Sequence, residues 1–172
     1  MTPVRRLLIL AIVLLTGAGG YVIGRAWFRP TERVRQPIAF NHEKHTTELG
    51  IECGTCHEYY AEGSHAGLPL LSTCMGCHET GQTDSPEEQK IRDMVAAGQN
   101  DVFRKLFRMP DHVFYSHRRH AGIAKLPCET CHGRIAETTS PPEKPLVRIN
   151  MNFCLECHRR EKVRSDCTGC HR

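Results

Sequence analysis

The stretch "HEKHTTELGIECGTCH" at residues 42–57 shares its histidine and cysteine positions with the stretch "HRRHAGIAKLPCETCH" at residues 117–132. Each copy has two histidines three positions apart, then two cysteines three positions apart, and then a histidine directly after the second cysteine. All five positions correspond at a constant offset of 75 residues. A set of metal-binding side chains that recurs at one fixed spacing indicates a structural repeat.

The second half of each copy is a C-x-x-C-H motif, and five such motifs use all ten cysteines of the chain. They are "CGTCH" at 53–57, "CMGCH" at 74–78, "CETCH" at 128–132, "CLECH" at 154–158 and "CTGCH" at 167–171. This spacing is that of c-type haem attachment, because two thiols can each bond to one vinyl group of a porphyrin while the adjacent histidine binds the iron. The sequence therefore predicts five covalently bound haem c groups.

The residues that this prediction assigns fall into two sets. The attachment residues are Cys53, Cys56, Cys74, Cys77, Cys128, Cys131, Cys154, Cys157, Cys167 and Cys170. The iron ligands on the attachment side are His57, His78, His132, His158 and His171. Zinc sites fit this pattern poorly, since they need four ligands each. Disulfides would suit an exported chain, but they do not explain a histidine after every cysteine pair.

Six further histidines are available as second ligands for the five irons: His42, His45, His65, His112, His117 and His120. The repeat favours the two H-x-x-H pairs, because imidazoles three positions apart lie on one helical turn yet point to different targets. We expect one histidine of each pair to bind the iron of its own module and the other to bind a neighbouring iron.

The fifth second ligand has three candidates, namely His65, His112 and Met151. A thioether ligand would raise the potential of a haem relative to imidazole. Methionine, however, more often fills gaps in a core.

The N-terminus contains 17 uncharged residues at 7–23, directly after Arg5 and Arg6. A helix of this length would be about 26 Å long, close to the lower limit for crossing a bilayer. Trp27 and Phe28 follow as expected for an interfacial belt. A cleaved signal peptide is the alternative, and both interpretations export the rest of the chain. We predict a single-pass anchor in the cell inner membrane with the haem domain in the periplasm.

Composition limits the other possibilities. The net charge of the polypeptide is +4, which is too weak to indicate nucleic-acid binding. With one Trp, four Tyr and six Phe, the chain has few large side chains for a core. We expect the haems to fill much of the interior.

The predicted organisation has six segments. They are an N-terminal signal anchor or transmembrane helix (1–28), a linker (29–36), a first dihaem module (37–81), a helical connector (82–110), a second dihaem module (111–160) and a terminal haem segment (161–172). In the connector, Ser85 and Pro86 predict a helix start, and Glu88 would complete a capping box. A second short helix is expected at 102–107. Elsewhere we expect loops and no strand, so the fold class is mostly loops with a few short α-helices packed around covalently bound haems.

Two families resemble this chain. The run F-x-H-x-x-H followed by C-x-x-C-H at residues 40–57 resembles the class III cytochromes c, which are c3/c7-like multihaem cytochromes with bis-histidine irons. More of the chain resembles the pentahaem subunit of alternative complex III. The similar stretches are "QPIAFNHEKH" from Gln36, "HAGLP" from His65, "CMGCH" from Cys74, "PDHVFYSHRRH" from Pro110, "CETCHG" from Cys128 and "MNFCLECHR" from Met151.

The second resemblance implies a membrane quinol oxidoreductase. Its pentahaem subunit passes electrons from iron–sulfur and quinol-site membrane subunits towards a soluble electron carrier or terminal oxidase. We therefore predict an electron-transfer subunit that is not itself an enzyme and has no catalytic residue. The alternatives are a pentahaem subunit of another quinone-linked redox complex and a multihaem reductase with an open-coordinate haem. Since all five motifs end in histidine and six more histidines are available, no iron is forced to stay open.

Overall fold

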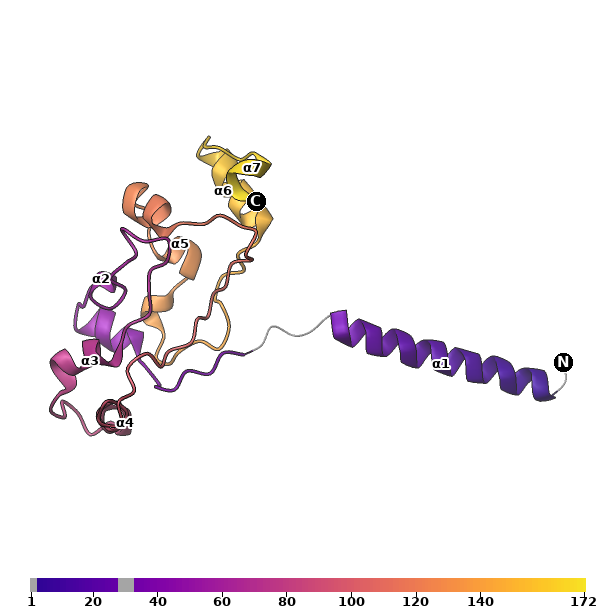
Figure 1. Ribbon diagram of the computed structural model, residues 1–172, viewed down its shortest axis with the longest axis horizontal. Coiled ribbons are helices and arrows are strands. Elements are labelled where there is room, and N and C mark those ends of the chain that lie inside the picture. The colour runs from indigo at the N-terminus through magenta and orange to yellow at the C-terminus, as the bar shows by residue number, and fades with distance from the viewer. Residues whose placement is uncertain (1–2, 28–32) are drawn as a thin grey trace. The chain divides into compact units, whose positions relative to one another are not determined.

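The chain divides into two units, Met1–Arg33 and Val34–Arg172, of which the computed structural model describes residues 3–27 and 33–172 (Figure 1). Phe28 and residues 29–32 of the predicted linker lie outside the described residues, and so does the side chain of Trp27. The expected interfacial belt therefore stays a prediction.

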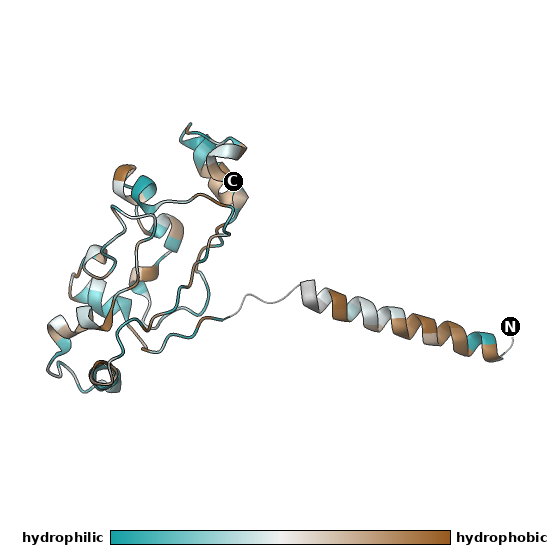
Figure 2. Cartoon of the chain, viewed as in Figure 1, coloured by the Kyte–Doolittle hydropathy of each residue, from teal (hydrophilic) through white to brown (hydrophobic). Residues whose placement is uncertain are grey.

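The first unit contains one helix, α1, at Pro3–Trp27. Figure 2 shows that most of this helix is hydrophobic, and large side chains such as Leu14 and Leu15 are exposed. Its Pro3–Gly24 part is long and apolar enough to cross a membrane, a criterion that N-terminal signal sequences also meet. An apolar surface of this extent needs an apolar environment.

The second unit is a chain of short helices joined by loops (Figure 1). The α-helices are α2 (Cys53–Cys56), α3 (Leu71–His78), α4 (Pro86–Ala96), α5 (Glu129–His132), α6 (Met151–Arg160) and α7 (Cys167–Cys170). Two π-helices, η1 (Glu43–Glu48) and η2 (Arg118–Ile123), and one 3₁₀-helix, η3 (Ile135–Glu137), complete the set. Within residues 3–27 and 33–172 there is no strand, only an isolated bridge between Val113 and His171. The expectation of loops and short helices without a sheet is confirmed.

The side-chain core of this unit is small. Among the described residues, the buried hydrophobic ones are Ile38, Leu71 and Ile91, which cluster where α3 packs on α4. A unit of this length with only side chains inside would bury far more apolar surface than three residues supply. The small side-chain core agrees with the few large side chains in the sequence.

The helix predicted in the connector is α4, and it begins as expected. Ser85 caps it by accepting a hydrogen bond from the Glu87 amide at 3.3 Å, and Pro86 is its first residue. The capping box, however, was a wrong prediction. The Ser85 amide donates to the Thr83 hydroxyl at 3.2 Å instead, and the Glu88 side chain turns inward.

The second predicted helix, at 102–107, does not form. The side-chain amide of Gln36 pairs with this segment instead: it donates to the carbonyl of Arg104 at 2.7 Å and accepts from the Arg104 amide at 2.9 Å. Val102 and Phe103 pack against the small core at the same time. Pairing with a distant side chain thus replaces the hydrogen bonds of a helical turn.

Candidate functional site

Each C-x-x-C-H motif lies on its own short helix. We number the motifs in chain order as site 1 (53–57, α2), site 2 (74–78, α3), site 3 (128–132, α5), site 4 (154–158, α6) and site 5 (167–171, α7). Helical residues three positions apart lie on the same side of a helix, so both thiols of a pair can reach one group. None of the ten cysteines forms a disulfide.

Two of these helices are fixed by side-chain caps. Asn150 accepts a hydrogen bond from the Phe153 amide at 3.0 Å at the start of α6. Asp166 accepts from the Gly169 amide at 2.9 Å at the start of α7. The caps hold the first turn of each helix, where the first cysteine of the site lies.

The two H-x-x-H pairs begin the two π-helices. His42 is the N-cap of η1 and His117 is the N-cap of η2, with nearly the same backbone angles. We expected an ordinary helical turn, but the wider π-turn is what the structure has. Single π-turns are rare and are found mostly at functional sites.

The surroundings of these histidines are repeated as well. The ring of Phe40 lies 4.8 Å from that of His42 and 4.4 Å from that of His45, measured between centroids. Tyr115, at the corresponding position, makes the equivalent two contacts at 5.0 and 4.8 Å. The offset of 75 residues seen in the sequence is therefore also a repeat of local structure.

Four histidines of the sites face a second histidine. The ring-centroid distances are 6.1 Å for His45–His78, 6.3 Å for His117–His132, 6.1 Å for His120–His158 and 5.5 Å for His112–His171. With metal–nitrogen bonds of about 2 Å and ~1 Å more to each ring centre, two imidazoles across one metal ion have centroids roughly 6 Å apart. The four pairs fit an iron held between the rings.

For site 1, the repeat predicts that His42 pairs with His57. His42 and His57 correspond to His117 and His132, which form one of the four pairs. Burial, followed by the nearby charge of His57, lowers the pKa of His42 to about 4. A buried, neutral imidazole is the form that binds a metal ion.

The other two candidate ligands lie differently. His65 is exposed, and its Nδ1 is 2.9 Å from the hydroxyl of the adjacent Ser64. Met151 is the first residue of α6 and is 60% exposed. Of the three candidates for the fifth position, His112 is the one that faces a site histidine.

The thiols of site 1 and site 3 meet at the repeat. Cys53 and Cys128 occupy equivalent positions in the two copies. Burial, followed by the Cys53 thiol and a hydrogen bond to it, raises the pKa of Cys128. Sites 1 and 3 are therefore neighbours in space although site 2 lies between them in the sequence.

The remaining sites extend outward from this contact. Burial, followed by the Cys56 thiol, raises the pKa of Cys74, which places site 2 beside site 1. Burial, followed by the Cys154 thiol, raises the pKa of Cys131, which places site 4 beside site 3. Burial, followed by the Cys170 thiol, raises the pKa of Cys154, which places site 5 beside site 4. These neighbouring thiols indicate the order 2–1–3–4–5 along the sites.

Comparisons with known proteins identify the family of the chain. The family described as "Cytochrome c7 and related cytochrome c" matches residues 113–172. The "Menaquinone reductase, multiheme cytochrome c subunit" of Nitratidesulfovibrio vulgaris is 31% identical over 144 residues, which cover 73% of this chain and 69% of that protein. The chain belongs to the c7-like multihaem cytochromes c. The predicted fold class is thereby confirmed, and membership implies covalently bound haem c.

Hollows border two of the sites in this multihaem cytochrome. One is lined by Cys56 of site 1 together with Tyr59 and Leu68. The other is lined by Cys157 of site 4 together with Phe153. Apolar and aromatic walls beside an attachment cysteine suit a flat porphyrin, so the residues present fit the group that the family carries.

Sequence reasoning missed the groups that orient the histidines of this cytochrome. The Nδ1 of His45 lies 2.8 Å from the carbonyl of Asn41, and the Nδ1 of His120 lies 2.9 Å from the carbonyl of Ser116. Such contacts fix which ring nitrogen is left for a metal. The signal was available, because Asn41 and Ser116 stand at the same offset as the histidines.

Proposed function

We propose that this cytochrome is a pentahaem electron-transfer subunit of a membrane-bound, quinone-linked redox complex. Haem iron held by two imidazoles supplies one-electron transfer and leaves no open position for a substrate. The proposal rests mainly on one observation: in four pairs, a site histidine faces a second histidine at a distance that fits an iron between the two rings.

The proposed ligand pairs use ten of the eleven histidines. They are His57 with His42 at site 1, His78 with His45 at site 2, His132 with His117 at site 3, His158 with His120 at site 4 and His171 with His112 at site 5. In each H-x-x-H pair, the first histidine thus serves the first site of its module and the second histidine serves the second. His65 and Met151 are not ligands in this arrangement.

The order 2–1–3–4–5 gives the chain two functional ends. The adjacency of Cys53 and Cys128 means that sites 1 and 3 join the two modules. Sites 2 and 5 each have one neighbouring site, so we infer that they exchange electrons with the partners. The residues of this chain fix the spacing of the five sites, and spacing and ligation determine how a relay works.

The partners follow from the relatives. The similar protein of N. vulgaris is named as a subunit of a menaquinone reductase. Together with the sequence resemblance to alternative complex III, it supports a complex with quinone-site and iron–sulfur membrane subunits, and with a soluble carrier or terminal oxidase as the other partner. Helix α1 would anchor the subunit in the inner membrane, with the haem sites in the periplasm.

The test is purification of the tagged full-length protein from its native membrane. We expect it to bring a quinone-binding membrane subunit with it. Reduction of the haems by an added menaquinol analogue would indicate a quinol oxidase of the alternative complex III type. Reoxidation of prereduced haems by a menaquinone analogue would indicate a menaquinone reductase. Isolation of the chain alone, with haems that react with neither compound, would contradict the proposal.

A further inference from the structure

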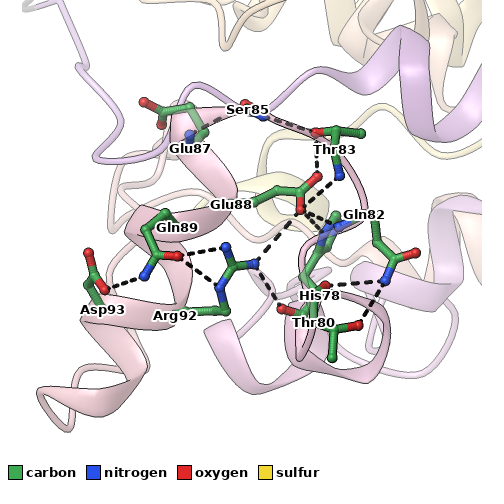
Figure 3. Close-up of polar contacts among 10 residues, drawn as sticks. All are labelled: His78, Thr80, Gln82, Thr83, Ser85, Glu87, Glu88, Gln89, Arg92 and Asp93. Carbon is green, nitrogen blue, oxygen red and sulfur yellow. Dashed lines mark hydrogen bonds and ion pairs between the residues drawn. The ribbon is translucent and has the colours of Figure 1, made fainter.

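One histidine of the sites faces a charged group. The Nδ1 of His78 lies 3.5 Å from Oε2 of Glu88, which reaches it from α4 (Figure 3). This is the distance of an ion pair, longer than a hydrogen bond, and the buried Nδ1 of His78 makes no hydrogen bond of its own. The carboxylate is therefore the charge that this ring nitrogen meets.

The carboxylate of Glu88 is held in place by the hydrogen bonds that it accepts. Its Oε1 accepts from the Thr83 hydroxyl at 2.6 Å, and its Oε2 accepts from the backbone amides of Gln82 and Thr83 at 2.8 and 3.3 Å. The residue is only 6% exposed. A buried carboxylate in such a cradle stays ionised and fixed.

Six of the other proposed ligand histidines have neutral partners at Nδ1. The Nδ1 atoms of His57 and His158 lie 2.9 and 2.6 Å from backbone carbonyl oxygens. The Nδ1 atoms of His45, His117 and His120 also lie near backbone carbonyl oxygens, at distances of 2.8 to 3.2 Å. The Nδ1 of His42 lies 3.2 Å from the Thr138 hydroxyl. A full negative charge beside Nδ1 distinguishes His78 from these six.

We propose that Glu88 is a positioning residue for site 2, which orients His78 and holds the reduction potential of the iron there below the value that a neutral partner would give. A negative charge beside the far nitrogen makes imidazole a stronger donor, and this favours the ferric over the ferrous state. The inference rests on the proposed function, since it assumes that His78 binds the iron of site 2.

The place of site 2 gives this effect a role. Site 2 lies at one end of the order 2–1–3–4–5, so its potential governs exchange with a partner at that end. Arg92 moderates the charge, since its Nη1 lies 3.8 Å from Oε2 of Glu88 and donates to the carbonyl of His78 at 3.5 Å. The negative charge of Glu88 and the positive charge of Arg92 would together set the reduction potential at site 2.

The test compares four full-length holoproteins by spectroelectrochemical titration: wild type, Glu88→Gln, Arg92→Gln and Asp93→Asn. Asp93 is the matched control, because it is an exposed acid of the same helix that contacts Gln89. In Glu88→Gln we expect one component to become about tenfold easier to reduce, a positive shift of about 59 mV for one electron. Arg92→Gln should shift the same component in the negative direction, and Asp93→Asn should shift none.

The shifting component can be assigned with His45→Ala, which should remove that same component from the low-spin set. If Glu88→Gln and Arg92→Gln both titrate like Asp93→Asn, the inference is overturned. A wild type without five low-spin haems would instead refute the proposed function, and this is seen before any variant is compared.

Discussion

The backbone amide of Glu43 donates to the carbonyl of Thr138 at 3.1 Å, so the first π-helix is docked on the second copy of the repeat. The reverse contact is present too, since the amide of Arg118 donates to the carbonyl of Gly63 at 2.9 Å. The two contacts correspond at the offset of 75 residues. Each H-x-x-H helix is thus held by the segment that follows the attachment motif of the other copy, and this brings sites 1 and 3 together.

A substitution at Gly122 tests whether each H-x-x-H helix must dock on the other copy of the repeat, an arrangement that we call interlocking. A Cβ at this position would collide with the backbone carbonyl of Ala61, so η2 would have to move away from the first copy. We expect Gly122→Ala to destabilise the holoprotein by about 1–3 kcal/mol, as overpacking does, and to weaken spin coupling between neighbouring haems. Denaturant unfolding and EPR measure the two effects. Gly81→Ala is the control, because a Cβ there meets only ordinary contacts, and an equal loss in both variants would contradict the interlocking.

His120 tests the pairing within a module. Its ring centroid lies 6.1 Å from that of His158. We expect His120→Ala to keep five attached haems, because all ten cysteines of the chain remain. We expect the iron of site 4 to become high-spin, because it loses its second histidine. Visible and EPR spectra measure this change. His65→Ala is the matched control and should leave the spectra unchanged. An unchanged spectrum in His120→Ala would refute the assignment.

The fifth pair has a test of its own. His112 lies 5.5 Å from His171, whereas Met151 is exposed at the start of α6. We expect one high-spin iron in His112→Ala and none in Met151→Leu, with carbon monoxide binding as the measurement. The opposite result would make the thioether the ligand.

Much of the site could be predicted from the sequence, because covalent chemistry fixes the local spacing. A C-x-x-C-H motif needs no tertiary context to identify its thiols and adjacent histidine, and a constant offset identifies a repeat. The pairing of His45 with His78 could not be predicted, since it depends on how α3 lies against η1. The ring distance of 6.1 Å is a property of the folded chain.

The errors at the connector have a physical cause. Ser85 and Glu88 form a correct capping-box pattern, but the half-buried His78 and the Thr83 hydroxyl compete for the carboxylate and win. The segment 102–107 has helical composition, but the amide of Gln36 satisfies its backbone from a distance. Tertiary contacts overrode local preference in both places.

The spatial order of the sites predicts unequal effects of removing haems. Replacing Cys53 and Cys56 by alanine removes the group at site 1 and separates site 2 from the rest. Replacing Cys167 and Cys170 removes only the end at site 5. In the first variant we expect the haem of site 2 to be reduced more slowly than the others, because it is separated from them. In the second variant we expect the four remaining haems to be reduced together. Stopped-flow spectroscopy measures both rates. Equal kinetics in both variants would contradict the order 2–1–3–4–5.

The central claim is that five irons are each held by two histidines and that none is open. Its most direct measurement is EPR of the oxidised full-length holoprotein together with carbon monoxide binding to the reduced form, at a known haem-to-protein ratio. We expect five haems per chain, low-spin signals alone and no carbon monoxide complex. A high-spin signal with carbon monoxide binding would contradict it and would favour a reductase.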